Sequence, residues 1–210
     1  VKLLLTTYFS SLAGHIDTVC SLPVAGLHVD AIRGAEDLKE IATKWPADRI
    51  LSVGVIDGRN IWKADLDKAL AVLRSPGLAG RQNLWVAPSC SLLHVPFSLD
   101  AETKMDLRLK QCLAFAVEKL EEIHALKDAL VKGDAAVADA LESSRRTVEL
   151  RKGDWVHNAQ VAKRVNALGE GIDRRKSPFD VRQALQRKRF RLPAFPTTTI
   201  GSFPQTQKIR

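Results

Sequence analysis

Four nearly unbroken apolar runs recur through the first hundred residues, and they limit the folds open to this chain more than any other feature. The runs are Lys2–Phe9, Leu27–Ile32, Ile50–Ile56 and Leu84–Ala87, and three of the four are followed by a helix-like stretch. Runs that do not alternate with polar residues are typical of strands buried on both faces of a parallel sheet. Their starts lie about 24 residues apart or somewhat more, a spacing that fits βα units.

The stretches between the runs have a helical period. Residues 35–45 and 63–74 each place apolar side chains at positions i, i+3, i+4 and i+7, which gives one apolar stripe on a charged helix. A closed (β/α)8 barrel has eight such units, so four make half a barrel. We therefore predict an α/β fold that is half of a TIM-type barrel. An open, doubly wound sheet is the alternative, but no Gly-rich dinucleotide or P-loop motif follows any run.

Past residue 100 the apolar runs stop and helical patterns take over. We predict one long helix over Asp100–Lys132, a continuation over Ala135–Glu142 after Gly133, and helices over Trp155–Leu168 and from Ser177-Pro178 to Arg189. From Leu192 the chain is rich in Pro and Thr, which is typical of a linker. The predicted division is a half barrel (1–100), a helical region that packs on it (101–190), and a linker that enters a further strand (191–210).

Composition excludes several classes of protein. Hydrophobic residues make up 45% of the chain, enough for a core, yet no apolar run approaches the roughly 18 residues of a membrane span. Three cysteines without a C-x-x-C pair do not make a disulfide framework, so we expect a cytoplasmic protein. Residues 151–210 carry 14 Lys and Arg against 4 Asp and Glu. The basic cluster Arg187–Arg191 matches no nucleic-acid motif, and we interpret it as a solvated helix end.

Polar residues follow every predicted strand, at the end where parallel α/β folds place their sites. A Cys and a His after the last run could both bind zinc, but convincing third and fourth ligands are absent, so a buried, inert Cys is favoured. The Asp-Gly pair after the third run marks a turn more readily than a catalytic base. The candidates are Tyr8 and Ser10, Asp30 and Arg33, Asp57, Arg59 and Asn60, and Ser89, Cys90 and His94.

Four segments resemble cobalamin-independent methionine synthase. They are GLHVDAIRG (26–34), LSVGVIDGRNIW (51–62), WVAPSCSLLHVP (85–96) and FPTTTIGSFPQT (195–206), and the resemblance runs essentially from end to end. The family has two barrels that look like a duplicated unit. The resemblance implies the second half of the N-terminal barrel, the helical region behind it, the interdomain linker and the first strand of the catalytic barrel. The chain also begins without Met, and we expect it to be a fragment.

The resemblance implies a zinc-dependent methyltransferase of methionine biosynthesis. It would move a methyl group from 5-methyltetrahydropteroyl-oligoglutamate, a folate, to homocysteine, whose sulfur a zinc ion of the catalytic barrel holds as a thiolate. The family's zinc ligands are one His, two Cys and one Glu of that barrel, and none is in this chain. Cys90 occupies a look-alike position in the N-terminal barrel. We therefore expect no zinc and no catalytic residue here. The matching site motif is Ile200, Gly201 and Ser202, which would contact the amino-acid part of homocysteine or methionine.

Two functions stay open at this point. The first is a fragment of that enzyme, inactive in isolation. The alternative is a non-catalytic half-barrel interaction module that associates with itself or with a separate catalytic subunit, because half a parallel barrel has two open edges. Neither reading involves nucleic acid or a membrane.

Overall fold

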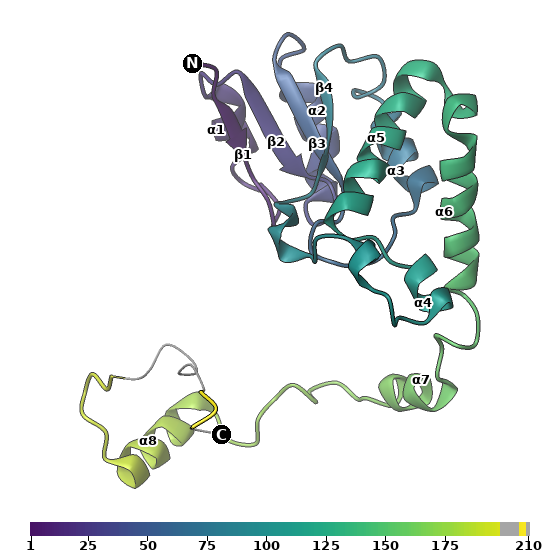
Figure 1. Cartoon of the computed structure of the whole chain (residues 1–210). Helices are drawn as coiled ribbons and strands as arrows, with labels where there is room; N and C mark the ends of the chain where they lie inside the picture. Colours follow the sequence, from purple (N-terminus) through teal and green to yellow (C-terminus); the bar gives the residue numbers. More distant parts are fainter. Residues whose placement is uncertain (198–205, 209–210) are drawn as a thin grey trace. The chain divides into compact units, whose positions relative to one another are not determined.

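A parallel sheet of four strands forms the centre of the chain in a computed structural model that describes residues 1–197 and 206–208. Its strands are β1 (Leu4–Thr6), β2 (Gly26–Asp30), β3 (Ile50–Ile56) and β4 (Leu84–Pro88), and each pairs with the next one in the sequence (Figure 1). The predicted α/β fold is confirmed, and four parallel strands are consistent with half of an eight-stranded barrel.

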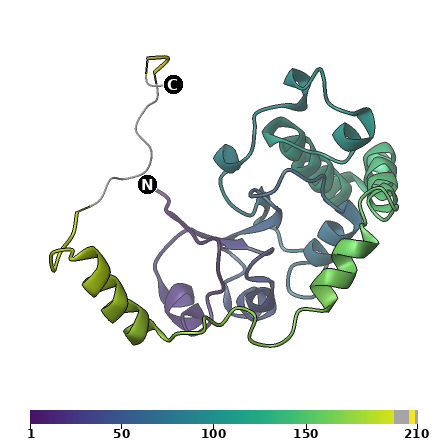
Figure 2. The same ribbon diagram turned by 90° about the horizontal axis from the view of Figure 1, so that it is seen from below.

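The two inner strands are buried on both faces, as their apolar sequences predict. Every residue of β2 is buried, and so is all of β3 except Ile50. Leu27, Leu51 and Val53 pack in one core with the helices α1 (Ile16–Ser21), α2 (Leu38–Lys44) and α3 (Leu66–Leu73). Seen from below, these purple and blue helices lie on one side of the strands (Figure 2). The core therefore fixes the sheet from its helical face.

The two helices predicted between the runs are present and somewhat shorter than expected. A 3-10 turn (Ala35–Asp37) leads into α2, and α3 begins at Leu66 rather than at residue 63. Asp65 caps α3, because its carboxylate accepts a hydrogen bond from the Lys68 backbone N–H at 3.1 Å. The cap sets the first residue of the helix, so residues 57–65 form a loop at the carboxyl end of β3.

The predicted single helix over Asp100–Lys132 is wrong. The segment instead forms a 3-10 turn (Leu99–Ala101), the short helix α4 (Leu107–Gln111) and the long helix α5 (Ala116–Lys132). Between α4 and α5 the backbone pairs with the loop after β3: Lys63 N–H donates to Cys112 O at 2.9 Å, and Ala114 N–H donates to Ile61 O at 2.8 Å. These bonds replace the helical ones and break the helix.

Helix α5 ends at Gly133, whose φ of 86° few other residues adopt. A 3-10 turn (Asp134–Val137) and helix α6 (Ala138–Leu150) follow. Helix α5 contacts β3, β4 and α3, and α6 contacts α3. The helical region through α6 thus packs against the sheet, and residues 1–157 form one compact unit.

Residues 158–210 form a second unit, in which two helices are described. Helix α7 (Ala159–Asn166) is capped by Asn158, and α8 (Phe179–Phe190) begins directly after Pro178, so Pro178 rather than Ser177 takes the cap position. The division predicted near residues 100 and 190 stays a prediction. In the part of the chain that the structure describes, no helix has the length and hydropathy of a membrane span.

Candidate functional site

The carboxylate of Asp30 organises the carboxyl end of β2. The residue is only 3% exposed, and its two oxygens accept hydrogen bonds from three backbone N–H groups. These are Phe9 N at 3.0 Å and Ile32 N and Arg33 N, both at 2.9 Å. Because the first donor follows β1 and the other two follow β2, Asp30 joins the ends of two neighbouring strands.

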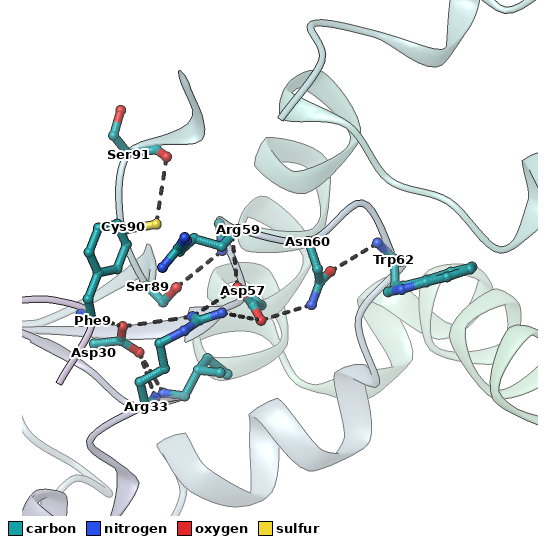
Figure 3. Close-up of polar contacts among 12 residues, drawn as sticks. Phe9, Asp30, Arg33, Asp57, Arg59, Asn60, Trp62, Ser89, Cys90 and Ser91 are labelled. Atoms are coloured by element: carbon teal, nitrogen blue, oxygen red, sulfur yellow. Dashed lines mark hydrogen bonds and ion pairs between the residues drawn. The ribbon is translucent and has the colours of Figure 1, made fainter. Parts of the chain in front are cut away.

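Arg33 connects the end of β2 to the end of β3. Its guanidinium donates two hydrogen bonds to Asp57, at 3.1 and 3.2 Å, and lies 3.9 Å from Asp30 (Figure 3). Asp57 also accepts from the Asn60 side chain at 2.8 Å and from the Arg59 backbone N–H at 2.9 Å. Burial pushes the pKa of Asp57 upward, but the hydrogen bonds from Arg33 and Arg59 outweigh it, so the pKa lies below its ordinary value.

The end of β4 lies against β3 so closely that glycine is needed. A Cβ on Gly54 would lie 2.6 Å from Ser89 Cα, and one on Gly58 would lie 2.9 Å from Cys90 O. The Ser89 hydroxyl accepts a hydrogen bond from Gly58 N–H at 3.1 Å. This contact brings Ser89 and Cys90 beside the Asp57 network (Figure 3).

An aromatic patch lies at the outer margin of the same cluster. Phe9 has a φ of 75°, which a non-glycine residue rarely adopts, and its N–H is fixed by Asp30. Its ring contacts Tyr8 (4.7 Å between centroids), His94 (5.4 Å) and the Arg59 guanidinium (4.5 Å). Tyr8, His94 and Arg59 are exposed, so a ligand at these strand ends would first meet this patch.

Most of the predicted strand-end residues do converge. Asp30, Arg33, Asp57 and Asn60 form one hydrogen-bonded cluster, and Ser89 and Cys90 adjoin it. Tyr8 and His94 each contact the Phe9 ring, whose backbone N–H donates to Asp30. No side-chain hydrogen bond is found for Ser10 among the residues described.

The donors of this cluster do not fit a zinc ion. The oxygens of Asp30 and Asp57 already accept hydrogen bonds from backbone N–H groups and from Arg33. Burial raises the pKa of the Cys90 thiol, which opposes the thiolate form that zinc binds. Within residues 1–197 and 206–208, no group of three or more His, Cys, Asp or Glu side chains is arranged to hold a metal.

His28 is a site residue that the sequence analysis missed. It is 6% exposed on β2, with Nδ1 2.9 Å from the Ser52 hydroxyl and Nε2 3.4 Å from Ser89 O. Burial lowers the pKa of His28, which favours the neutral form of the ring inside the sheet. The sequence showed only one polar residue within each of two apolar runs, and the pairing of His28 with Ser52 becomes visible in the register of β2 and β3.

We expect the free energy of unfolding to decrease as the pH is lowered, because His28 is buried. The unfolded chain takes up a proton below a pKa of about 6.5, whereas the buried ring takes it up only at a lower pH. The contribution of His28 is therefore complete above pH 6.5 and is lost progressively as the pH falls from there to the lowered pKa of the folded state. At pH 5.5 the loss relative to pH 7.5 is at most about 1.4 kcal/mol, the limit for a ring that stays neutral at both pH values. Urea unfolding at both pH values should show this slope in the wild type and not in His28→Gln. Equal slopes would contradict a neutral, buried His28.

Two buried charges on α5 were also missed, and they position the site loop. Lys119 is fully buried and its Nζ donates to Trp62 O at 3.1 Å, while Glu122 accepts from Ala64 N–H at 2.8 Å. Burial lowers the pKa of Lys119 and raises that of Glu122. Both side chains hold the loop 57–65, which carries Asp57 and Asn60.

The predicted ligand motif Ile200, Gly201 and Ser202 lies outside the described residues.

Comparison with known proteins agrees with the resemblance seen in the sequence. Residues 1–77 match the family model of the cobalamin-independent synthase N-terminal domain. The whole chain is 50% identical to the 5-methyltetrahydropteroyltriglutamate–homocysteine methyltransferase of Acidithiobacillus ferrooxidans and covers 27% of it. The chain is also 50% identical to the protein of that name from Nitrobacter winogradskyi, of which it covers 28%. It is 48% identical to the one from Klebsiella pneumoniae, of which it covers 27%. The chain is therefore a homologue of the cobalamin-independent methionine synthases, and it spans about a quarter of their length.

Proposed function

We propose that the chain forms part of an enzyme that transfers the methyl group of 5-methyltetrahydropteroyltriglutamate to homocysteine. The supporting observation is identity of 48–50% over the whole chain with relatives whose names state this activity. The three cysteines are all free, which suits a reducing compartment, and we place the protein in the cytoplasm.

The described residues supply a scaffold for this reaction. Arg33 donates hydrogen bonds to both Asp30 and Asp57. The charged groups of this cluster therefore bind one another and hold the strand ends together. Zinc, which would hold the homocysteine sulfur as a reactive thiolate, belongs in this proposal to the part of the enzyme outside this chain. We accordingly propose no catalytic residue in this chain and expect no activity from it in isolation.

A chimeric enzyme tests the proposal. The matching 210 residues of the Acidithiobacillus ferrooxidans methyltransferase are replaced by this chain, and methyl transfer to homocysteine is measured. We expect kcat/KM within about tenfold of the parent enzyme, a difference of about 1.4 kcal/mol, and no transfer by the isolated chain. A chimera that folds and binds both substrates without transferring the methyl group would refute the proposal.

The same chimera tests the proposed contact of Ile200, Gly201 and Ser202 with homocysteine. A serine hydroxyl and backbone N–H groups beside a glycine can bind a carboxylate closely. Ser202→Ala should raise KM for homocysteine about tenfold, as expected for one lost hydrogen bond to a charged group. Thr197→Ala, an exposed hydroxyl in the same segment, is the matched control and should leave KM unchanged. Equal KM values for the two variants would exclude the contact.

A second candidate function is favoured by the sheet edges. Within the described residues, β1 pairs only with β2 and β4 pairs only with β3, so each end of the sheet has an edge without a partner strand. Such edges are templates for pairing with another chain. On this ground we propose, as the alternative, a half-barrel module that associates with a copy of itself or with a separate catalytic subunit.

A further inference from the structure

The loop after β3 contains a short segment, residues 61–64, that is hydrogen-bonded on both sides like the middle strand of a sheet. On one side Lys63 N–H donates to Cys112 O at 2.9 Å, and Ile61 O accepts from Ala114 N–H at 2.8 Å. The even-numbered residues of the segment point to the other side, as the alternation of a strand requires. There the backbone meets side chains of α5 and α6 in place of a second strand.

Three buried side chains make these contacts. Lys119 Nζ donates to Trp62 O at 3.1 Å, and the Glu122 carboxylate accepts from Ala64 N–H at 2.8 Å. The Ser144 hydroxyl, on α6, donates to Ala64 O at 2.8 Å. Lys119 is fully buried, and Glu122 and Ser144 are 7% and 3% exposed. Because the chain itself buries these groups, the arrangement does not depend on polypeptide outside it.

The two charges are costly in this position. The Lys119 ammonium makes one hydrogen bond, to a neutral carbonyl, and no ion pair in the part of the chain that the structure describes. Glu122 Oε2 is buried and has no hydrogen-bond partner among the same residues. Burial lowers the pKa of Lys119, and the charges of Glu122 and Asp57 act against that change. Buried charges are tolerated when opposite charges lie near them, so the two side chains depend on each other.

Asp57 joins this pair to the strand-end cluster (Asp30, Arg33, Asp57 and Asn60). Lys119 and Asp57 line one cavity of about 340 Å³, together with Asn60 and Trp62. Asp57 also accepts the two hydrogen bonds from Arg33 (Figure 3). Charges of alternating sign therefore run from β2 to α5, in the order Asp30, Arg33, Asp57, Lys119 and Glu122.

We infer that Lys119 and Glu122 are positioning residues, which act as one charged unit and fix Asp57 and Asn60 at the strand ends from helix α5. Their hydrogen bonds hold the backbone of the loop 57–65, and the charge of Lys119 holds the carboxylate of Asp57. An apolar pair could fill the same space, but it would give the loop backbone neither a donor nor an acceptor. The inference goes beyond the proposed methyl transfer and does not depend on it.

Amide hydrogen exchange in the purified 210-residue chain tests the positioning. Lys119→Met combined with Glu122→Gln removes both charges, so it leaves no unpaired buried charge and should keep the fold. The N–H groups of Arg59 and Trp62, which bond to side chains of the cluster, should exchange about tenfold faster than in the wild type. Val53, buried in the middle of β3, should exchange at the wild-type rate.

Three results of this measurement would overturn the inference. Wild-type exchange at Arg59 and Trp62 would show that the loop is held without the pair. Equal acceleration at Val53 would show a general loss of stability and no local positioning. A double variant that does not fold would show that the pair is needed for the core as a whole.

Urea unfolding of the single variants tests whether the two charges act as a unit. Lys119→Met and Glu122→Gln each leave one buried charge without its partner, so each should raise the unfolding equilibrium constant about a hundredfold. The double variant should raise it less than either single variant, and a single variant that fails to fold beside a folded double variant would show the same coupling. Double-variant effects equal to the product of the single effects would contradict it.

Lys68→Met is the matched control for both measurements. Lys68 lines the same cavity, but its side chain is 86% exposed and its ammonium lies 3.4 Å from Asp65. Exposed ion pairs contribute little to stability, so this variant should change the unfolding equilibrium constant by less than about fivefold. Exchange at Arg59 should stay at the wild-type rate. An effect as large as that of Lys119→Met would show that any charge beside this cavity acts on the loop.

Discussion

Asp30→Ala is expected to lower the free energy of unfolding by about 4 kcal/mol. The carboxylate accepts three backbone N–H groups and lies 3.9 Å from the Arg33 guanidinium, all in a site that is almost fully buried. Hydrogen bonds to a charged group each contribute about 1.5–3 kcal/mol, and water that enters the cavity recovers part of the loss. Without Asp30, Phe9 also loses the contact that fixes its positive φ.

Urea unfolding of three variants checks this expectation. Asp30→Asn keeps one acceptor oxygen for Ile32 and Arg33 and replaces the other by an NH2 group, which cannot accept from Phe9 N–H, so it should lose about half as much. Asp48→Ala removes an exposed carboxylate from a loop and should change the free energy of unfolding by less than about 0.5 kcal/mol. A loss for Asp30→Ala as small as that for Asp48→Ala would show that the strand ends are held together by other contacts.

Gly54→Ala should cost about 3 kcal/mol, the second largest effect we expect. The added Cβ would lie 2.6 Å from Ser89 Cα and 2.9 Å from Pro88 O, so backbone atoms of the β4 segment must move. Overpacking of this kind typically costs about 1–3 kcal/mol, and backbone atoms yield less readily than a side chain. The Ser89 hydroxyl accepts a hydrogen bond from Gly58 N–H, and the Ser89 carbonyl oxygen lies 3.4 Å from His28 Nε2. A shift of Ser89 would therefore disturb the contacts at the carboxyl ends of β2, β3 and β4.

Gly169→Ala is the matched control for this prediction. It makes the same chemical change at a glycine with no other heavy atom within 4 Å of its Cβ position. We expect a change below about 0.5 kcal/mol by the same urea measurement. If Gly54→Ala is tolerated equally well, β3 and β4 are farther apart in solution than their contact here implies.

The strands and most helices could be predicted because their signals are local. Ile50–Ile56 is an apolar run bounded by polar residues, and its bounds agree with those of β3. The broken helix could not be predicted in this way, since helical periodicity continues through residues 112–115. The competing hydrogen bonds come from Ile61 and Lys63, about fifty residues earlier in the chain. Tertiary pairing overrides local propensity there.

The candidate site was predictable as a set of residues and not as a set of contacts. Polar residues at strand ends indicated Asp30, Arg33 and Asp57, but their pairing depends on the register between β2 and β3. His28 was missed because a single histidine in an apolar run carries no signal until the neighbouring strand supplies Ser52. Lys119 and Glu122 resembled ordinary charged positions of an amphipathic helix, although both are buried.

The strand order has a consequence for how the chain acquires its structure. Each strand pairs with the one that precedes it in the sequence, so the sheet needs no contacts between the two ends of the chain. Loop-closure entropy stays small for such neighbouring pairings, and topologies dominated by them fold faster than those that join distant segments. A growing chain could therefore add one strand and its helix at a time, in the order in which a ribosome releases them.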